Sequence, residues 1–401
     1  MRDNTLATKG LLALSLVIAI DSFGFEMVLP LLAPLFSKSQ HFVPVSTDLP
    51  QRHIYYGLTL GIYSFMVFLS APCWGALSDR YGRRLILLIC VATGLFAFLG
   101  TGICIFYGLV WLFILMRAIS GGAAGSEAVA QAWVVESSPA GQRYRYLGFL
   151  IAALVVGAIA GPFVSGYLTL GNVSVHWRFA RPFFLVFLLS LMNLIILLVV
   201  FRSHSAPNKE VNSRQRPGFF STPGLMGLAF SYLLFQLGWG LYSMTNPIRL
   251  IALFHFDALH IGLLIALLGT GFVLSLVFLT PRLLDQFGTR ASAVAGCIAM
   301  GAMVCLTLIV PTPDYWQYIM AFLVGVANGV GVLSFMSAFA EIGQTESCGF
   351  FIGVANASMS LALALSGFLL THLLNLSAVY VFLIAAALSV LGTVCLTLAK
   401  A

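Results

Sequence analysis

Residues 72–84 read PCWGALSDRYGRR, and residues 279–290 read LTPRLLDQFGTR, a weaker copy of the first stretch. Three pairs of residues match between the two stretches: Asp79 with Asp285, Gly82 with Gly288, and Arg84 with Arg290. Each pair is separated by 206 residues, about half of the 401-residue chain. A repeat with this period predicts a molecule built from two similar halves.

The composition around this repeat is that of a membrane protein. Hydrophobic residues make up 60% of the chain and charged residues only 8%, and the mean hydropathy is +1.01. A soluble domain carries about 25% charged residues, so this much apolar surface requires lipid as its solvent. The net charge of +7 comes without a basic stripe or basic helix. We therefore expect lipid and no nucleic acid as a partner.

Two further features narrow the class of protein. The seven cysteines are scattered without a CxxC pair, which favours small buried apolar residues over disulfides or a metal site. The first apolar run, from Leu11 to Phe36, is longer than the apolar part of a signal peptide and lacks an A-x-A cleavage site. We expect this run to be the first membrane span.

Apolar stretches of the length that a helix needs to cross a bilayer, about 20 residues, recur along the whole chain. We predict twelve spans, at 10–36, 54–77, 85–106, 109–135, 146–170, 181–201, 223–248, 259–281, 291–310, 316–340, 347–371 and 376–399. The polar segment 202–222 separates them into two sets of six. The prediction is an all-α integral membrane protein, with six-helix bundles at 1–201 and 223–401 joined by a cytoplasmic loop. Internal repeats of this kind occur in transporters whose substrate site lies between the repeats.

The basic residues indicate an orientation in the membrane. Of the 20 Lys and Arg residues, 14 fall on the side that holds both termini, and five, including Arg249, fall on the other. Arg117 lies within a span. The positive-inside rule then predicts cytoplasmic termini. The compact loops favour a multi-pass protein of the bacterial inner membrane.

The stretch from Gly75 to Arg84 resembles the loop signature of the major facilitator superfamily, and the twelve spans, central loop and second copy extend this resemblance over the whole chain. In this loop, Gly82 permits a tight turn, and Asp79 can pair with an arginine or cap a helix. The resemblance also implies that Glu136, at the end of the fourth span, meets these arginines in a cytoplasmic lock. The predicted conformational gate comprises Gly75, Asp79, Arg80, Gly82, Arg83, Glu136, Arg143, Asp285 and Arg290. The alternative is that these charges are topology anchors and loop-end ion pairs.

Three spans resemble the tetracycline-type and multidrug proton antiporters of that superfamily. The first span reads DSFGFEMVLPLLAP over residues 21–34, with Glu26 where the tetracycline exporters carry a small residue. In the fourth, Arg117-x-x-Ser120-Gly121 is similar to an Arg-x-x-Gln-Gly element. The fifth span contains an element typical of antiporters, with Gly157, Gly161, Pro162 and Gly166. Its small residues allow close helix approach and its proline allows a bend, so we predict a bendable joint, with plain helix packing as the alternative.

Four charged residues lie within predicted spans, where a charge costs on the order of 3 kcal/mol. They are Asp21, Glu26, Arg117 and Glu127. On one continuous helix, Arg117 and Glu127 would lie roughly 15 Å apart and about 80° around the axis, so both could border one cavity. We predict that the acids couple transport to protons, first Glu26 and Glu127 and then Asp21, while Arg117 tunes them or binds an anionic group. The alternative is a structural role in caps and interhelical pairs.

Polar and aromatic residues in other spans are candidates for substrate contact. The predicted cavity residues are Gln131, Gln236, Trp239, Tyr242, Asn246, Asn328 and Asn356. The second half has no central carboxylate, which suggests that protons bind in the first half and that both halves share the substrate. Interhelical hydrogen bonds use the same residue types and are the alternative explanation.

The leading hypothesis is an exporter of a small organic molecule, such as a drug-like compound or a siderophore, driven by the proton gradient without a cofactor. A proton symporter that imports an amino acid or nucleoside stays open. A scaffold is disfavoured by the buried charges, and an enzyme by the absence of a catalytic constellation or nucleotide-binding domain. His255-x-Asp257-x-x-His260 could hold a metal, but Asp257 more simply caps the eighth helix. The resemblance implies a monomer.

Overall fold

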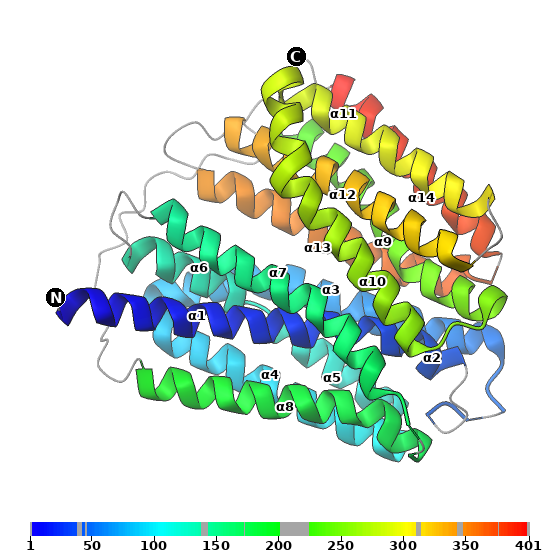
Figure 1. The fold of residues 1–401 in the computed structure, drawn as a ribbon, viewed down its shortest axis with the longest axis horizontal. Coiled ribbons are helices and arrows are strands. Elements are labelled where there is room, and N and C mark those ends of the chain that lie inside the picture. The colour runs from blue at the N-terminus through cyan, green and yellow to red at the C-terminus, as the bar shows by residue number, and fades with distance from the viewer. Residues whose placement is uncertain are drawn as a thin grey trace. The chain divides into compact units, whose positions relative to one another are not determined.

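A computed structural model describes residues 2–37, 42–44, 46–137, 143–171, 173–200, 224–309, 314–342, 348–375 and 377–398. In this described part every regular element is a helix (Figure 1). The elements up to the central segment are α1 (Arg2–Glu26), α2 (Leu29–Ser37), α3 (Leu49–Tyr81), α4 (Arg83–Tyr107), α5 (Val110–Ala123), α6 (Ser126–Ser137), α7 (Arg143–Leu168) and α8 (Val175–Val200). The later elements are α9 (Leu225–Phe254), α10 (Ala258–Leu274), the π-helix η1 (Ser275–Leu279), α11 (Thr280–Ile309), α12 (Asp314–Ile342), α13 (Cys348–Leu373) and α14 (Ala378–Leu398).

These helices account for the twelve predicted spans. Within the described residues, ten helical stretches are long and apolar enough to cross a membrane, and the shorter helix Val110–Ala123 adds another. One of the ten, Ala258–Leu308, has 51 residues, which at 1.5 Å per residue is more than twice the thickness of a hydrocarbon core of about 30 Å. This stretch bends at Gly288, so it supplies two crossings. The prediction of an all-α membrane fold is confirmed.

The repeated loop adopts a related backbone in both copies. Gly82 separates α3 from α4 with a φ of 93°, and Gly288 bends α11 with a φ of 77°. Both values lie in the region that side chains with a Cβ rarely adopt. The sequence match at a spacing of 206 residues therefore reflects the same physical requirement, a sharp turn between two successive spans.

The predicted first span consists of two helices, α1 and α2, because the helix is interrupted between Glu26 and Leu29. Pro30 has no N–H to donate to the carbonyl of Glu26. The backbone hydrogen bonds change accordingly, since the N–H of Val28 reaches the carbonyl of Phe25 at 3.3 Å. The break therefore places the side chain of Glu26 at the C-terminal end of a half-helix.

The predicted fourth span is also broken, which corrects the expectation of one continuous helix over 109–135. Helix α5 ends at Ala123, and α6 begins at Ser126. Gly125 lies in this break against Trp74, and a Cβ at that position would clash with the indole ring. The indole N–H donates to the carbonyl of Gly122 at 2.5 Å, so Trp74 satisfies a carbonyl near the end of α5.

A further irregularity precedes the second copy of the loop. The π-helix at Ser275–Leu279 lies just before Pro281, which cannot donate a backbone hydrogen bond. The hydroxyl of Thr280 donates to the carbonyl of Ser275 at 2.9 Å. The insertion of one extra residue in this turn is thus compensated by a side chain.

The chain divides into two compact units. The first comprises residues 1–47, 66–211 and 257–263, and the second comprises residues 48–65, 212–256 and 264–401. Helices α3 and α10 each contribute to both units. The predicted central loop at 202–222 lies outside the described residues, so the predicted domain boundaries stay a prediction.

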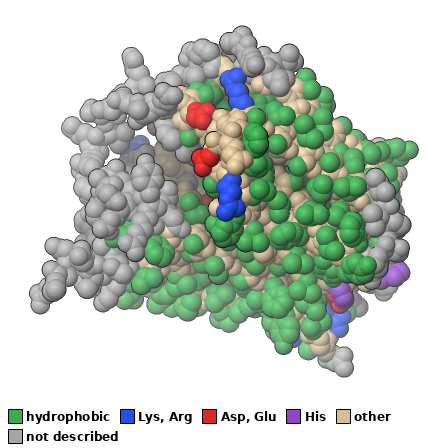
Figure 2. Space-filling model, turned by 45° about the horizontal axis from the view of Figure 1, so that its top comes forward, with side chains coloured by type: hydrophobic (Ala, Val, Ile, Leu, Met, Phe, Trp, Pro, Cys, Tyr) green, Lys and Arg blue, Asp and Glu red, His purple; other side chains and the backbone are tan. Residues whose placement is uncertain are grey.

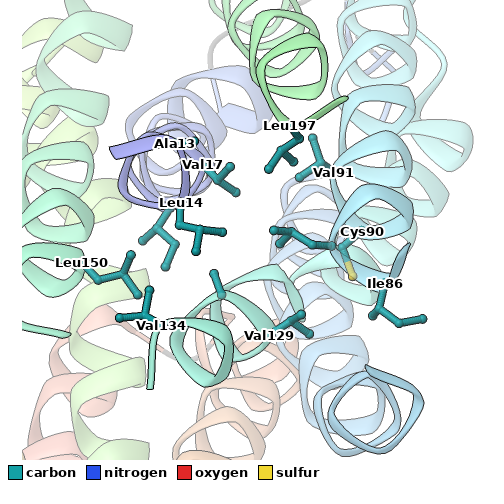
Figure 3. Packing of buried hydrophobic residues seen from close by; sticks show 13 residues of the cluster. Ala13, Leu14, Val17, Ile86, Cys90, Val91, Val129, Val134, Leu150 and Leu197 are labelled. Carbon is teal, nitrogen blue, oxygen red and sulfur yellow. The ribbon is translucent and has the colours of Figure 1, made fainter. Parts of the chain in front are cut away.

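The core of the first unit is formed by small and branched aliphatic side chains. Leu14 and Val17 of α1 pack with Val91 of α4, Val129 of α6 and Leu150 of α7 (Figure 3). Each of these side chains is almost completely buried. These four helices thus meet around one apolar centre, which fixes the position of the acidic end of α1.

The core of the second unit is more aromatic. Tyr232 and Phe235 of α9 pack against Phe335 of α12, with ring centroids 5.1 and 5.7 Å apart. A Cβ at Gly331 would collide with the ring of Phe235, so this glycine permits the close approach of α12. Helix α9 is therefore surrounded by bulky neighbours, and its polar side chains are buried with it.

The surface agrees with a lipid environment. Hydrophobic side chains cover most of the face drawn in Figure 2, and the charged side chains on this face gather in small groups. Large apolar residues such as Phe96, Trp111 and Ile195 are more than half exposed. Exposing an apolar surface of this extent to water would be unfavourable, whereas lipid hydrocarbon is a suitable solvent for it.

Candidate functional site

Two of the predicted coupling acids lie close together in the first unit. The carboxylate of Asp21 in α1 accepts a hydrogen bond from the hydroxyl of Ser126 at 2.6 Å, across to the start of α6. The carboxylate of Glu127 accepts one from the side-chain amide of Gln131 at 2.9 Å. The negative charges of Asp21 and Glu127 are also near enough to interact. Asp21 on α1 and Glu127 on α6 thus each accept a hydrogen bond from a neutral donor.

Glu26 lies in a different environment, beside α7. Its Cβ would be 3.4 Å from a Cβ built at Gly161, so the side chain sits directly against the glycine. It makes no hydrogen bond or ion pair within the part of the chain that the structure describes, and it is half-buried. Asp21 therefore contacts α6, whereas Glu26 contacts α7.

Arg117 is the buried cation of the first unit, with only 2% of its surface exposed. The break at Ala124 and Gly125 overturns the predicted geometry between Arg117 and Glu127. An axial distance of roughly 15 Å and an offset of about 80° apply only to one continuous helix. The small residues of the Gly121–Gly125 segment, packed against Trp74, are the physical reason for the break.

The glycines of α7 permit close contacts with two neighbours. A Cβ at Gly157 would clash with the carbonyl of Ala19 in α1, and one at Gly161 would lie 2.6 Å from the carbonyl of Phe23. A Cβ at Gly166 would lie 2.7 Å from the carbonyl of Ala258. Helix α7 continues through Pro162 without interruption. The predicted close packing is present, whereas the predicted bending stays a prediction.

In the second unit, three predicted cavity residues are buried with an unsatisfied side-chain oxygen. The amide oxygens of Gln236, Asn246 and Asn328 have no hydrogen-bond partner among the described residues. The amide nitrogen of Gln236 donates to Tyr232 at 3.3 Å, and that of Asn246 to Tyr242 at 3.4 Å. Each buried polar atom without a partner is costly, so these oxygens indicate sites that water or a ligand completes.

The remaining predicted cavity residues of the second unit lie on α9 and α13. Trp239 is half-buried and packs against Tyr242, with ring centroids 6.3 Å apart. Asn356 lies on an exposed part of α13. The structure thus gathers Trp239 and Tyr242 on α9, and it shows no contact that joins Asn356 to them within the described residues.

Arg249 is a buried residue that the sequence interpretation missed. It was expected in a loop outside the membrane, but it lies inside α9 and is only 6% exposed. Its guanidinium donates to the amide oxygen of Gln317 at 3.4 Å and to the carbonyl of Thr307 at 3.1 Å. The predicted span ended at residue 248, yet α9 runs to Phe254. The continued apolar run after Arg249 was the signal that could have revealed its position.

The predicted gate is described only in part. Arg83 donates to the hydroxyl of Ser78, and the Arg80 guanidinium lies 5.3 Å from the ring centroid of Tyr81. Gly75 has open space around it. The side chains of three other predicted members lie outside the described residues, namely Asp79, Glu136 and Arg143.

The second copy of the loop has a partner that was not predicted. Asp285 and Arg290 are exposed, and between them the hydroxyl of Thr289 donates to the carboxylate of Glu341 at 2.9 Å. Glu341 ends the tenth span, as Glu136 ends the fourth, and the two are 205 residues apart. The repeat spacing of 206 residues was therefore the signal that could have identified Glu341.

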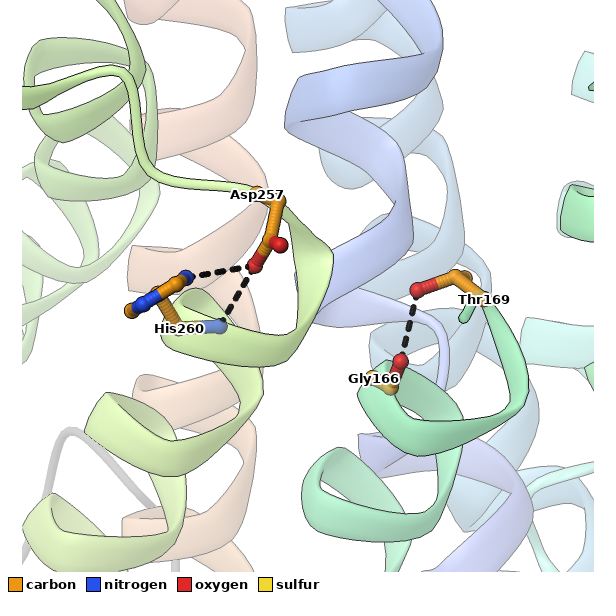
Figure 4. A network of polar contacts seen from close by, with 4 residues as sticks. All are labelled: Gly166, Thr169, Asp257 and His260. Carbon is orange, nitrogen blue, oxygen red and sulfur yellow. Dashed lines mark hydrogen bonds and ion pairs between the residues drawn. The ribbon is translucent and has the colours of Figure 1, made fainter. Parts of the chain in front are cut away.

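The turn between α9 and α10 contains the motif considered for a metal. Asp257 caps α10 as predicted, since its carboxylate accepts the backbone N–H of His260 at 2.9 Å and the ring of His260 at 2.7 Å (Figure 4). Burial opposes ionisation, but these bonds to His260 outweigh it and lower the pKa of Asp257. His255 adopts a left-handed backbone at the end of α9, with a φ of 53°. This geometry is that of a helix cap.

The chain is similar in sequence to two kinds of resistance protein. The chain is 27% identical over 326 residues to the class C tetracycline resistance protein of Escherichia coli, which covers 79% of this chain and 77% of that protein. It is also 27% identical over 316 residues to the multidrug resistance protein MdtG of Enterobacter lignolyticus, covering 76% of this chain and 71% of that protein.

Solved structures share the fold at low sequence identity. The D-xylose-proton symporter has a TM-score of 0.77 at 14% identity, covering 96% of both chains. The human organic anion transporter MFSD10 has a TM-score of 0.68 at 17% identity, covering 97% of this chain and 99% of that one. The sequence profile of the Major Facilitator Superfamily matches residues 14–226 and 228–400, nearly the whole chain. The chain is therefore a multi-pass membrane transporter that belongs to the Major Facilitator Superfamily.

Proposed function

We propose that this transporter exports a small amphipathic organic molecule in exchange for protons. The observation that carries the proposal is the position of Glu26, a carboxylate at the broken end of α1 with no polar partner among the described residues. Unwound helix ends within a membrane are typical of the ion sites of secondary transporters. Proton binding would neutralise a charge that is costly to keep there.

The proton would be exchanged as the surroundings of the acids change. Ser126 and Gln131 donate hydrogen bonds that favour ionised Asp21 and Glu127, whereas Glu26 has no such donor. A change in the access of water or in the distance to Arg117 would shift the relative free energies of the protonated and ionised forms. Alternation between two conformations would then load the proton on one side and release it on the other.

The printed names of the relatives support export. They include tetracycline resistance proteins of several classes and a multidrug resistance protein. The buried amides of Gln236, Asn246 and Asn328 would provide polar contacts for the organic substrate. We further propose a monomer in the bacterial inner membrane with both termini in the cytoplasm. The proton gradient would be the energy source, without a cofactor and without nucleic acid as a partner.

The proposal can be tested with purified protein in proteoliposomes that enclose a pH dye. A pH gradient is imposed, and a panel of drugs, siderophores, amino acids and nucleosides is added in turn. We expect at least one drug-like compound to drive protons opposite to its own movement. Movement of protons and compound in the same direction would instead establish the importer.

Single variants connect this flux to the acids. We expect Glu26→Gln and Glu127→Gln each to reduce coupled proton flux. The matched control is Asp257→Asn, since Asp257 is also a carboxylate but caps α10 outside the spans. Wild-type coupling in both Glu26→Gln and Glu127→Gln would contradict the assignment of the proton to these residues.

A further inference from the structure

Arg249 is a buried cation at a junction of four helices in the second unit. It comes from α9, five residues before the helix ends at Phe254. Its guanidinium bonds to Thr307 of α11 and Gln317 of α12, and it lies 5.5 Å from the ring centroid of Phe382 in α14. With 6% of its surface exposed, Arg249 does not reach out to the lipid headgroups as a long side chain near a helix end commonly does.

The partners of Arg249 leave its charge uncompensated. Both hydrogen-bond acceptors are neutral oxygens, and the third neighbour is an apolar ring. No Asp or Glu pairs with it in the part of the chain that the structure describes. A guanidinium has five N–H donors, of which the two bonds use two. The positive charge of Arg249 and three of its N–H donors thus remain available to a further partner.

A purely structural role does not explain why this residue is charged. Placing a cation within a membrane protein without a counter-charge is expensive. An uncharged amide could bridge α11 and α12 with the same neutral acceptors and without that expense. The bond to Gln317, at 3.4 Å, is also long for a group selected to hold helices together.

The neighbours of Arg249 supply what a planar anionic ligand requires. Tyr242 lies seven residues before Arg249, about two turns along the same face of α9. Its hydroxyl interacts with the side chain of Thr307, whose carbonyl accepts from Arg249. The ring of Phe382 lies 5.3 Å from that of Tyr242, so an aromatic wall borders the guanidinium.

We propose that Arg249 binds the carboxylate of an organic anion that this protein transports. The planar guanidinium matches a carboxylate in a two-point contact, and the ring of Phe382 would pack against the apolar part of the ligand. Tyr242 and Asn246, on the same face of α9, would add polar contacts. The inference rests on the proposed function only for the statement that the bound anion is cargo.

The test measures charge preference by equilibrium binding to the purified full chain in detergent. The probes are naphthoate and naphthamide, which share a ring system and a shape but differ in charge. We expect wild-type protein to bind naphthoate about tenfold more tightly, a difference of about 1.4 kcal/mol. Arg249→Gln should abolish this preference, and Arg249→Lys should keep part of it, because a lysine retains the charge without the planar fork.

Control variants distinguish recognition of naphthoate by Arg249 from a loss of folding and from the effect of removing any arginine. Arg178→Gln removes a cation whose bond goes to the carbonyl of Gly171, and it should keep the wild-type preference. If Arg249→Gln does not fold, Tyr242→Phe is used instead, and a weakened affinity for naphthoate is expected. Equal binding of both probes to wild-type protein overturns the proposal. A preference that persists in folded Arg249→Gln, or in Tyr242→Phe with unchanged affinity, also overturns it.

Binding in detergent needs no proton gradient, so the two proposals can fail separately. Naphthoate preference without coupled proton flux from any compound would retain the anion site and remove the antiport mechanism. Proton flux driven by neutral or cationic drugs, together with equal binding of naphthoate and naphthamide, would retain antiport and remove the anion site.

Discussion

The helices of the two units differ in their acidic residues although their loops repeat. In the first unit the acids Asp21, Glu26 and Glu127 lie on α1 and α6, and the buried cation Arg117 lies on α5. In the second unit the buried polar groups are amides, hydroxyls and one cation, Arg249. The loops preserve the same turn at Gly82 and Gly288 because both halves need a sharp connection between spans. The repeat thus accounts for the two turns, while the side chains on the helices differ between the units.

This difference suggests a division of labour. A carboxylate can gain or lose a proton, whereas an amide cannot, so the acids on α1 and α6 of the first unit are the groups equipped to carry protons through the membrane. Amides and a guanidinium can recognise the polar groups of an organic molecule. On this view the acids determine proton coupling, the glycines of the repeated turn determine stability, and the buried amides determine substrate binding.

The largest effect is expected from Glu26→Gln. Gln has nearly the same shape but cannot exchange a proton, so coupled proton flux in proteoliposomes should fall at least tenfold. Substrate affinity measured in detergent should change much less, because the fold around Gly161 is preserved. Asp21→Asn should have a smaller effect on flux, since Ser126 can still donate to the amide oxygen. A larger loss in Asp21→Asn than in Glu26→Gln would move the main proton site to the α1–α6 contact.

The repeated turn should respond similarly in both units. Gly82→Ala and Gly288→Ala place a Cβ on a backbone with a φ of 93° or 77°, which costs about 1–2 kcal/mol. Each variant should lower the melting temperature of the purified protein. Gly75→Ala is the matched control, because Gly75 is helical and a Cβ there meets nothing within 4 Å. Equal melting temperatures for all three variants would show that the turn geometry does not limit stability.

The repeated turn was predictable from sequence, whereas the interior was predictable only in part. Glycine at 82 and 288 and the length of each apolar run depend on local rules that a single chain reveals. The break at Gly125 was not predictable in this way, since it depends on Trp74, about 50 residues earlier in the chain. Burial of Arg249 likewise depends on Thr307 and Gln317, which approach only in the folded protein.

In the candidate site, too, some features follow from the local sequence and others depend on contacts between distant residues. The acids of α1 and α6 were predictable because a charge within an apolar run is rare and expensive. The contact between Thr289 and Glu341 could have been inferred from the repeat, but only by extending the alignment beyond the loop itself. Polar residues that form ordinary interhelical bonds have the same sequence appearance as substrate contacts, so their roles need the experiments described here.

Replacement of a buried amide should separate stability from function in the second unit. Asn328 is 4% exposed and its amide oxygen has no partner among the described residues. Asn328→Leu removes this unsatisfied group, so we expect stability to increase by about 1 kcal/mol and substrate affinity to fall. Ser366→Ala is the control, since this hydroxyl already bonds to carbonyls at 2.9 and 3.1 Å and its loss should not stabilise the protein. Unchanged substrate affinity in Asn328→Leu would assign Asn328 to helix packing.

The smallest effect is expected at the cap of α10, outside the spans of both units. Asp257→Asn removes a charged cap that is more than half exposed, so the loss of stability should be only about 0.5–1 kcal/mol. Because the pKa of Asp257 is lowered in the folded protein, its contribution is present above the unfolded pKa of about 3.9 and is lost as the pH falls through the folded pKa. Melting temperatures of wild type and Asp257→Asn should therefore differ at pH 7 and converge below about pH 4. A difference that stays constant with pH would show that the cap acts through its hydrogen bond alone, and a difference in proton flux would extend the acid chemistry beyond α1 and α6.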